Sequence, residues 1–258
     1  LSEAWLDVTH LGIGAHPDDL EFMAFHGIEV CRRGGGRFGG VVVTDGAGSV
    51  RTRDETPVEL SLRRRAEQRR AAQIGGYALV VQLGLASEEA KAGDRGRLPA
   101  ALDEILGLAS PKVVYTHNPA DRHDTHVAVS LAVIAALRRL PEARRPEKVY
   151  GCEVWRDLDW LTGDDRVRLD CGADEAFAQE LNSVFLSQTG AGKRYDLAVV
   201  GRRRAQATFD DPRSPDAAEM VTLAMDLTPL VRDPGLGVAE HVLGMVERFR
   251  ADVAARLS

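Results

Sequence analysis

A histidine and two aspartates stand side by side near the start of the chain, in the run His16-Pro17-Asp18-Asp19. They follow an apolar segment, 8–14, which predicts a buried strand. Imidazole nitrogens and carboxylate oxygens both bind divalent metals, and of two adjacent acids one can be a ligand while the other acts as a base. Open α/β sheets bind their ligands at the carboxyl ends of strands, so this turn is a candidate active site. An ordinary turn with an aspartate helix cap is the alternative.

A second group of histidines follows a later apolar segment. Residues 112–116 predict another buried strand, and His117, His123 and His126 lie within the ten residues after it. His123 and His126 are three positions apart at the start of a predicted helix over 124–139, so their side chains can point in the same direction. Because both groups follow parallel strands, we expect them to meet at one edge of the sheet.

Such a meeting would make a three-ligand metal site from His16, Asp19 and His126. Three protein ligands with one open position are typical of catalytic zinc, whereas structural zinc is normally closed by four ligands. The pattern therefore predicts a catalytic metal site rather than a structural one. Two histidines and one carboxylate also bind iron in Fe(II) oxygenases, so an Fe(II) enzyme is one alternative. A metal-binding or carbohydrate-binding protein without turnover is another, although Asp18 beside the ligands favours catalysis.

The elements that must position these residues alternate between strand and helix patterns over the first 155 residues. This alternation favours an α/β fold with a mostly parallel sheet and helices on both faces. Strands are predicted over 8–14, 41–43, 79–83, 112–116 and 148–154, and helices over 20–31, 57–73 and 124–139. The second of these helices has a clear start, because Thr56 and Glu59 form a capping box around Pro57.

The pattern is less regular after residue 155. Helices are predicted over 173–187, 196–207 and 236–257, and a loop over 211–216. The sequence contains no internal repeat. We therefore expect a single domain over 1–258, whose irregular C-terminal third, about 156–258, completes the site.

Composition narrows the class of protein. A chain of 258 residues with 44% hydrophobic and 28% charged residues is ordinary for a globular domain with a sizeable core. The net charge of −6 argues against nucleic acid as a partner, and three unpatterned cysteines indicate a reducing compartment. The sequence shows no signal-peptide pattern and no apolar run of about 18 residues. We expect a cytoplasmic protein without a membrane span, acting on a small molecule; a homo-oligomer is compatible with the sequence.

The turn at His16 and the His-x-x-His pattern starting at His123 resemble the signatures of the LmbE-like, or PIG-L, deacetylases. Arg64-x-x-Glu67 and the run 186–188 resemble further elements of that family. The resemblance implies a Rossmann-like fold and a zinc-dependent hydrolase that removes the acetyl group from an N-acetylglucosamine-type amino sugar. A thiol-cofactor precursor or a glycosylated antibiotic would be a suitable substrate.

The resemblance also implies roles for individual residues. His16, Asp19 and His126 would bind Zn²⁺, with Fe²⁺ as the alternative metal. Asp18 would be the general base, and His123 would stabilise the oxyanion or help as an acid.

The chain departs from the family between the two histidines. The family more often reads His-Pro-Asp-His, whereas Asp124 and Thr125 lie between His123 and His126 here. The aspartate that would orient His123 is thus displaced or lost, and we expect Asp121 or Asp124 to set its tautomer. Asp124 is also the expected cap of the helix that starts here.

Further contacts to the substrate are expected from three polar residues in loops that follow predicted strands and from one arginine on the helix predicted over 57–73. These residues are Asp45, Arg51, Arg64 and Asp121. For Asp45 and Arg51, a place on the loop surface is an equal alternative. Trp155 and Trp160 could stack on a sugar, but we expect them to pack into the fold.

Overall fold

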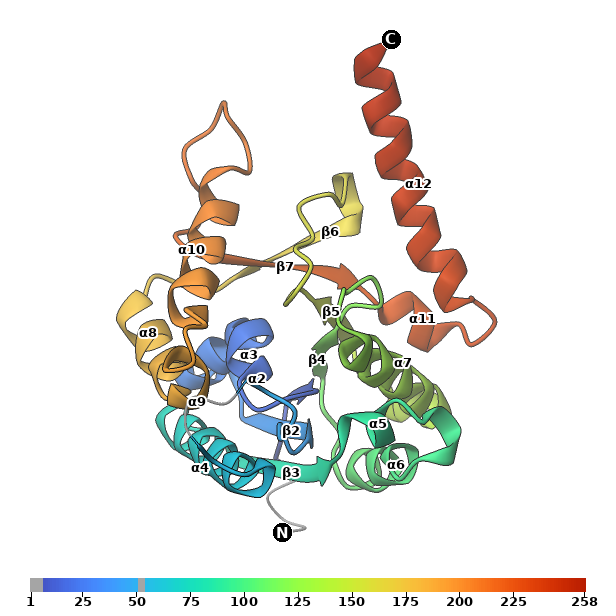
Figure 1. The fold of residues 1–258 in the computed structure, drawn as a ribbon. Helices are drawn as coiled ribbons and strands as arrows, with labels where there is room; N and C mark the ends of the chain where they lie inside the picture. The colour runs from blue at the N-terminus through green and yellow to red at the C-terminus, as the bar shows by residue number, and fades with distance from the viewer. Residues whose placement is uncertain (1–6, 51–53) are drawn as a thin grey trace.

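The computed structural model describes residues 7–50 and 54–258, and its central element is a seven-stranded sheet (Figure 1). The strands are β1 (His10–Gly14), β2 (Phe38–Thr44), β3 (Leu79–Leu85), β4 (Val113–His117), β5 (Lys148–Cys152), β6 (Arg166–Asp170) and β7 (Val221–Asp226). Their order across the sheet is β3-β2-β1-β4-β5-β7-β6. The first five strands run parallel, while β7 is antiparallel to β5 and to β6. The predicted Rossmann-like class is confirmed.

Helices cover both faces of this sheet (Figure 1). One face carries α2 (Asp19–Met23), α3 (Phe25–Val30), α4 (Pro57–Ile74), α8 (Glu175–Ser183), α9 (Leu186–Thr189) and α10 (Tyr195–Thr208). The other carries α5 (Ser87–Ala90), α6 (Leu98–Leu108), α7 (Asp124–Arg139), α11 (Thr228–Arg232) and the first half of α12 (Val238–Leu257). Short turns of other helix types are η1 (Cys31–Gly35), η2 (Gly93–Arg95), η3 (Glu142–Arg144) and η4 (Gly163–Asp165).

The strands send alternate side chains into two separate hydrophobic clusters. On β2, Val41 and Val43 belong to the cluster beneath α6 and α7, whereas Val42 belongs to the cluster beneath α2 and α3. This alternation follows from the two-residue period of a strand. All seven residues of β2 are buried, which explains its uninterrupted apolar run in the sequence.

The helices predicted over 57–73, 124–139 and 196–207 match α4, α7 and α10 to within one residue at each end, whereas two other predicted helices are each divided in two. The capping box of Thr56 and Glu59 is present at the start of α4. The predicted helix over 20–31 divides at Ala24 into α2 and α3, and the one over 173–187 divides into α8 and α9. The second break places Phe185 in the core and brings the next turn to α4, where the Ser187 hydroxyl donates to Glu67 at 2.5 Å.

The C-terminal third contains two strands that the sequence did not predict. β6 lies at the sheet edge and alternates arginines with apolar residues over five residues, the two-residue period of a half-buried strand, although no strand was predicted there. β7 is a short apolar run, and such runs do not distinguish a strand from a buried helix segment by periodicity. Both strands join the sheet formed by the N-terminal part of the chain.

Within the described part of the chain, no helix has the length and apolar character needed to cross a membrane.

The strand order creates a crevice at one position. β1 lies between β2 and β4, so the connections leaving β1 and β4 diverge to opposite faces of the sheet. Open α/β folds bind ligands outside the carboxyl ends of the strands at such a switch point. The turn after β1 starts at Ala15, and the loop after β4 spans residues 118–123. The fold thus brings together the two segments that carry the predicted site.

We predict that His26 makes stability depend on pH. His26 on α3 is hydrogen-bonded to the Tyr115 hydroxyl at 2.8 Å, and burial lowers the pKa of His26 to about 4. An unfolded histidine has a pKa of about 6.5, so between these values only the unfolded state takes up the proton, and stability falls as the pH falls. Urea unfolding at pH values between 7 and about 4.5 measures the free energy of unfolding. This free energy should decrease less in His26→Gln than in the parent as the pH falls. Equal losses would contradict the prediction.

Candidate active site

The turn after β1 holds Asp18 in an unusual backbone conformation. Asp18 has φ 102°, the only positive φ of a non-glycine residue in the described ranges. Its backbone N–H donates to Gln68 Oε1 of α4 at 3.0 Å, and its side chain makes no capping bond to α2. An aspartate that serves only as a helix cap does not fit this geometry. Strain of this kind persists where the surrounding structure enforces it, and it is concentrated at functional sites.

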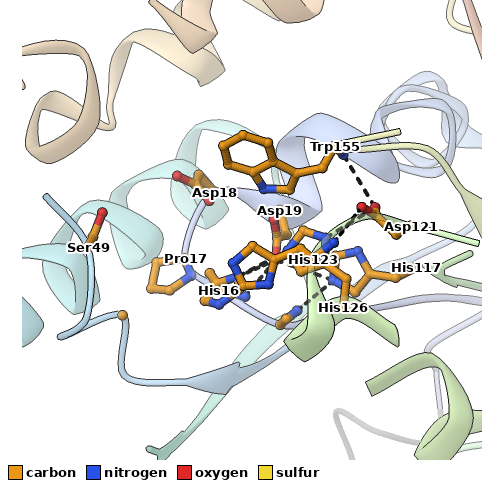
Figure 2. A network of polar contacts seen from close by, with 12 residues as sticks. His16, Pro17, Asp18, Asp19, Ser49, His117, Asp121, His123, His126 and Trp155 are labelled. Carbon is orange, nitrogen blue, oxygen red and sulfur yellow. Dashed lines mark hydrogen bonds and ion pairs between the residues drawn. The ribbon is translucent and has the colours of Figure 1, made fainter. Parts of the chain in front are cut away.

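Three side-chain atoms from the two loops converge on one point (Figure 2). Asp19 Oδ2 lies 3.2 Å from His16 Nδ1 and 3.4 Å from His126 Nε2, and the two imidazole nitrogens are 3.1 Å apart. Ligand atoms about 2.1 Å from a tetrahedral ion lie about 3.4 Å from one another. The triangle of donor atoms therefore fits a divalent cation of this size. His126 and Asp19 are buried, while His16 is partly open to solvent.

His117 also contacts this cluster but has a different function. Its Nε2 lies 3.3 Å from Asp19 Oδ2, so Asp19, His117 and His126 form a second group with metal-ligand spacing. The same Nε2 accepts a hydrogen bond from the Ala15 backbone N–H at 2.8 Å. That bond uses the lone pair that a metal would need, so His117 ties β4 to the turn after β1, and its Nε2 is not free to bind a metal.

His123 lies next to the triangle and faces the open space. Its ring centroid is 4.8 Å from that of His16 and 4.6 Å from that of His126. Its Nδ1 is buried, with no hydrogen-bond partner in the described part of the chain. Asp124 begins α7 and His123 occupies the cap position, so the expected cap is displaced by one residue. Neither aspartate expected to orient the His123 ring contacts it.

Asp121 instead orients a proposed metal ligand. Its Oδ2 lies 3.3 Å from His126 Nδ1 and accepts the Trp155 backbone N–H at 3.3 Å. Its Oδ1 accepts the backbone N–H groups of Arg122 at 2.5 Å and His123 at 3.2 Å. These contacts hold the Asp121 carboxylate against protein groups. The sequence analysis expected this carboxylate to contact the substrate. A carboxylate behind a ligating histidine fixes the ring and its tautomer.

Arg64 joins the turn after β1 to the loop after β2 on the other side of the site. Its buried guanidinium donates to the carbonyls of Pro17 at 2.6 Å and Gly46 at 3.1 Å, and to Asp18 Oδ2 at 3.1 Å. Gly46 has φ 69°, and a side-chain carbon there would come within 2.7 Å of Arg64 Nη1. The close approach of the guanidinium therefore requires glycine at this position.

Of the other residues expected to contact the substrate, only some line the cavity beside the site. Arg64 lines the cavity beside the site. The carboxylate of Asp45 accepts the Ala47 backbone N–H at 2.9 Å and does not line that cavity. Arg51 lies outside the described residues.

The charges of the site are unevenly distributed. Burial raises the pKa of Asp18 well above its usual value, and the Arg64 guanidinium only partly offsets this. Burial also acts to raise the pKa of Asp19, but His126 and His117 outweigh it and hold that pKa well below its usual value. Burial opposes a proton on His126, yet Asp19 and Asp121 raise the pKa of His126 to about 9. The geometry thus favours a positive charge where the three donor atoms meet.

A cavity of about 540 Å³ opens next to the triangle. His16, Asp18, Asp19 and His123 are among its lining residues. The lining also includes residues whose role the sequence did not reveal, among them Arg122, Trp155, Tyr195 and Arg202. Trp155 had been expected to pack into the fold. Arg122 directly precedes His123, but no spacing pattern links the other three to His16, Asp19 and His126, because Trp155 comes from the loop after β5 and Tyr195 and Arg202 come from α10.

Arg64 should be essential for stability. Arg64→Ala would leave the buried Asp18 carboxylate and two carbonyls without their donor, so the free energy of unfolding should fall by about 3 kcal/mol. Arg65→Ala is the matched control, since Arg65 is exposed and its guanidinium reaches only the Gln82 carbonyl at 3.4 Å. The control should change stability by less than about 0.5 kcal/mol. Urea denaturation measures the free energy of unfolding of both variants. Equal decreases would show that the hydrogen bonds of the Arg64 guanidinium contribute little to stability.

Comparisons with known proteins agree with this fold and motif set. The family model described as PIG-L, GlcNAc-PI de-N-acetylase, matches residues 11–137. The uncharacterized deacetylase YaiS of Escherichia coli K12 is 30% identical over 137 residues, covering 51% of this chain and 69% of that protein.

Solved structures share the fold at lower identity. N,N'-diacetylchitobiose deacetylase from Pyrococcus horikoshii has a TM-score of 0.64 at 17% identity, covering 84% of each chain. GalB, the 4-carboxy-2-hydroxymuconate hydratase from Pseudomonas putida KT2440, has a TM-score of 0.61 at 17% identity, covering 85% of this chain and 95% of that one. These likenesses concern the fold, whereas the sequence matches identify the family. The chain belongs to the PIG-L family of de-N-acetylases.

Proposed function

We propose that this protein is a metal-dependent deacetylase that hydrolyses the N-acetyl group of an N-acetylglucosamine-type amino sugar. The family supports the general class, a hydrolase acting on an amide bond. The observation that carries the finer proposal is the triangle of His16, Asp19 and His126 donor atoms, with Asp18 on the lining of the same cavity. Three ligands leave one position of a tetrahedral ion open, as in catalytic zinc sites.

In this proposal His16, Asp19 and His126 hold the cation, with Zn²⁺ as the first choice and Fe²⁺ as the alternative. A bound divalent cation polarises a carbonyl oxygen and lowers the pKa of water in its vicinity. The protein residues then bind the substrate, move its protons and stabilise the charge that develops on its acetamide oxygen.

Asp18 is the proposed general base. Its carboxylate lines the cavity, and burial raises its pKa, which makes it a stronger proton acceptor than an exposed aspartate. Asp18 takes a proton from the attacking water as the oxygen bonds to the acetamide carbon. Return of that proton to the departing nitrogen gives acetate and the free amino sugar. Arg64 keeps the carboxylate in place throughout.

His123 is the proposed oxyanion donor. Burial lowers the pKa of His123, and the neighbouring His126 lowers it further. A neutral imidazole still has one N–H, and this group can donate to the carbonyl oxygen as negative charge develops there. Of the two roles implied by the family resemblance, the lowered pKa favours the oxyanion donor over the acid.

Acetate release decides between this proposal and its alternatives. A panel of N-acetylglucosamine glycosides with different aglycones, including a thiol-cofactor precursor and a glycosylated antibiotic, should be assayed with and without chelator. Chelator-sensitive acetate release without oxygen consumption would support the deacetylase. Oxygen consumption would favour the Fe(II) enzyme, and binding without turnover would favour a carbohydrate-binding protein.

The base assignment can be tested with Asp18→Asn. The substitution removes the proton acceptor but keeps the size of the side chain, so the rate of acetate release should fall by roughly 10²–10⁴-fold. Metal content, measured by elemental analysis, should stay unchanged because Asp18 is not a proposed ligand. A variant that holds its metal and hydrolyses as fast as the parent would show that another group is the base.

The orienting role of Asp121 predicts a loss of metal affinity. Asp121→Asn should weaken Zn²⁺ binding by about 10–100-fold, because the neutral amide no longer polarises His126 Nδ1. Asp124→Asn is the matched control, since Asp124 is an exposed aspartate three residues away. Competition with a chromophoric chelator measures both affinities. Similar affinities for the two variants would assign Asp121 a purely structural role.

A further inference from the structure

We propose that Trp155 and Tyr195 form an aromatic wall that stacks against the apolar face of a pyranose ring. This inference rests on the proposed function and assigns residues of this chain to recognition of the sugar ring: with them the site would favour a cyclic amino sugar over an acyclic acetamide. The two residues lie far apart in the sequence, in the loop after β5 and at the start of α10, and the fold brings them to the same cavity.

The exposure of Trp155 is the first observation. Its relative exposure is 39% although it lines a concave cavity, and its ring centroid lies 6.1 Å from that of His123. Figure 2 shows the indole over the cluster that contains His16 and His123. Trp160, five residues later, packs edge-on against Phe249 of α12 and has a buried Nε1. A large aromatic ring left open beside a reactive centre is typical of a ligand-binding surface.

The backbone at Trp155 is fixed in place. The Trp155 N–H donates to Asp121 Oδ2 at 3.3 Å, and its carbonyl accepts from Arg122 Nη2 at 2.7 Å and Nε at 3.2 Å. Asp121 also contacts His126, so the position of the indole is coupled to that of a proposed metal ligand. Such pre-organisation reduces the entropy lost when a ligand binds.

A buried glutamate anchors the rest of this loop. Glu153 accepts the backbone N–H of Leu158 at 3.1 Å and that of Leu223 in β7 at 3.0 Å, together with the Gln206 side-chain amide at 2.8 Å. The aromatic residue thus stands on a loop held to the sheet on one side and to the metal site on the other.

The lining of the cavity matches the two-sided character of a sugar ring. Tyr195 packs edge-on against Trp155 at 6.1 Å and against Phe22 at 5.7 Å between ring centroids, so the Tyr195 ring holds the Trp155 indole from the side and the two rings form adjoining sides of the cavity. Other elements contribute polar lining, including Ser49 and Gln188, which are hydrogen-bonded to each other at 3.0 Å. A pyranose has apolar C–H faces and hydroxyl groups around its rim. An acyclic acetamide has no comparable face for the wall to cover.

The first test compares a cyclic and an acyclic substrate. For the methyl glycoside of N-acetylglucosamine, Trp155→Ala should raise KM about tenfold and change kcat by less than about threefold, since it removes binding that substrate and transition state share. For N-acetylethanolamine, kcat/KM should change by less than about twofold. Trp155→Phe should restore most of the KM. An unchanged KM for the glycoside, or equal losses on both amides, would overturn the proposal.

The second test does not depend on hydrolysis. The methyl glycoside is titrated into chelator-treated protein, and tryptophan fluorescence is recorded. The parent and the matched control Trp160→Phe should show a saturable change, and Trp155→Phe should not. A change that persists in Trp155→Phe would overturn the proposal even if acetate release is intact. A Trp155-dependent change in a protein that releases no acetate would support the wall while the deacetylase function fails.

Discussion

The buried carboxylate of Asp19 is the charge around which the site is organised. Burying a carboxylate is costly unless opposite charge and hydrogen bonds compensate for it. Here one oxygen accepts the His16 backbone N–H at 2.6 Å and faces imidazole nitrogens of His16 and His126. Next to it Asp18 is buried as well, and the Arg64 guanidinium partly offsets the cost of burying that second carboxylate. The raised pKa of His126 shows that the remaining negative charge attracts a positive one.

This arrangement depends on the order of the strands. His16 and His126 are 110 residues apart, and they meet because β1 and β4 are parallel neighbours whose carboxyl ends share one edge of the sheet. The family match, residues 11–137, includes every residue of the proposed chemistry. Trp155 and Tyr195, the proposed sugar contacts, lie beyond it. The chain therefore carries its proposed chemistry on the N-terminal βα units and its proposed substrate recognition on the elements that follow.

The central part of the fold was predictable because each element has a strong local signal. Central strands of a parallel sheet are apolar on both faces, and the helix at Thr56 carries its own capping box. The two strands of the C-terminal third gave weaker signals, since β6 has only five residues and β7 is a short apolar run that could equally be part of a buried helix. The break between α8 and α9 was equally hidden, because it depends on the burial of Phe185 and on the contact of Ser187 with α4.

The sequence by itself determined the family, the strand–helix alternation and the residue types that could bind a metal, because these are written in short contiguous motifs. The ligand roles stay predictions, but the structure places His16, Asp19 and His126 together. Only the tertiary structure decided that Asp121 contacts His126, that the lone pair of His117 is already used, and that Trp155 faces the cavity. Each of these depends on which atoms of distant segments come within hydrogen-bond or ring-packing distance. Residue spacing along the chain does not specify those distances.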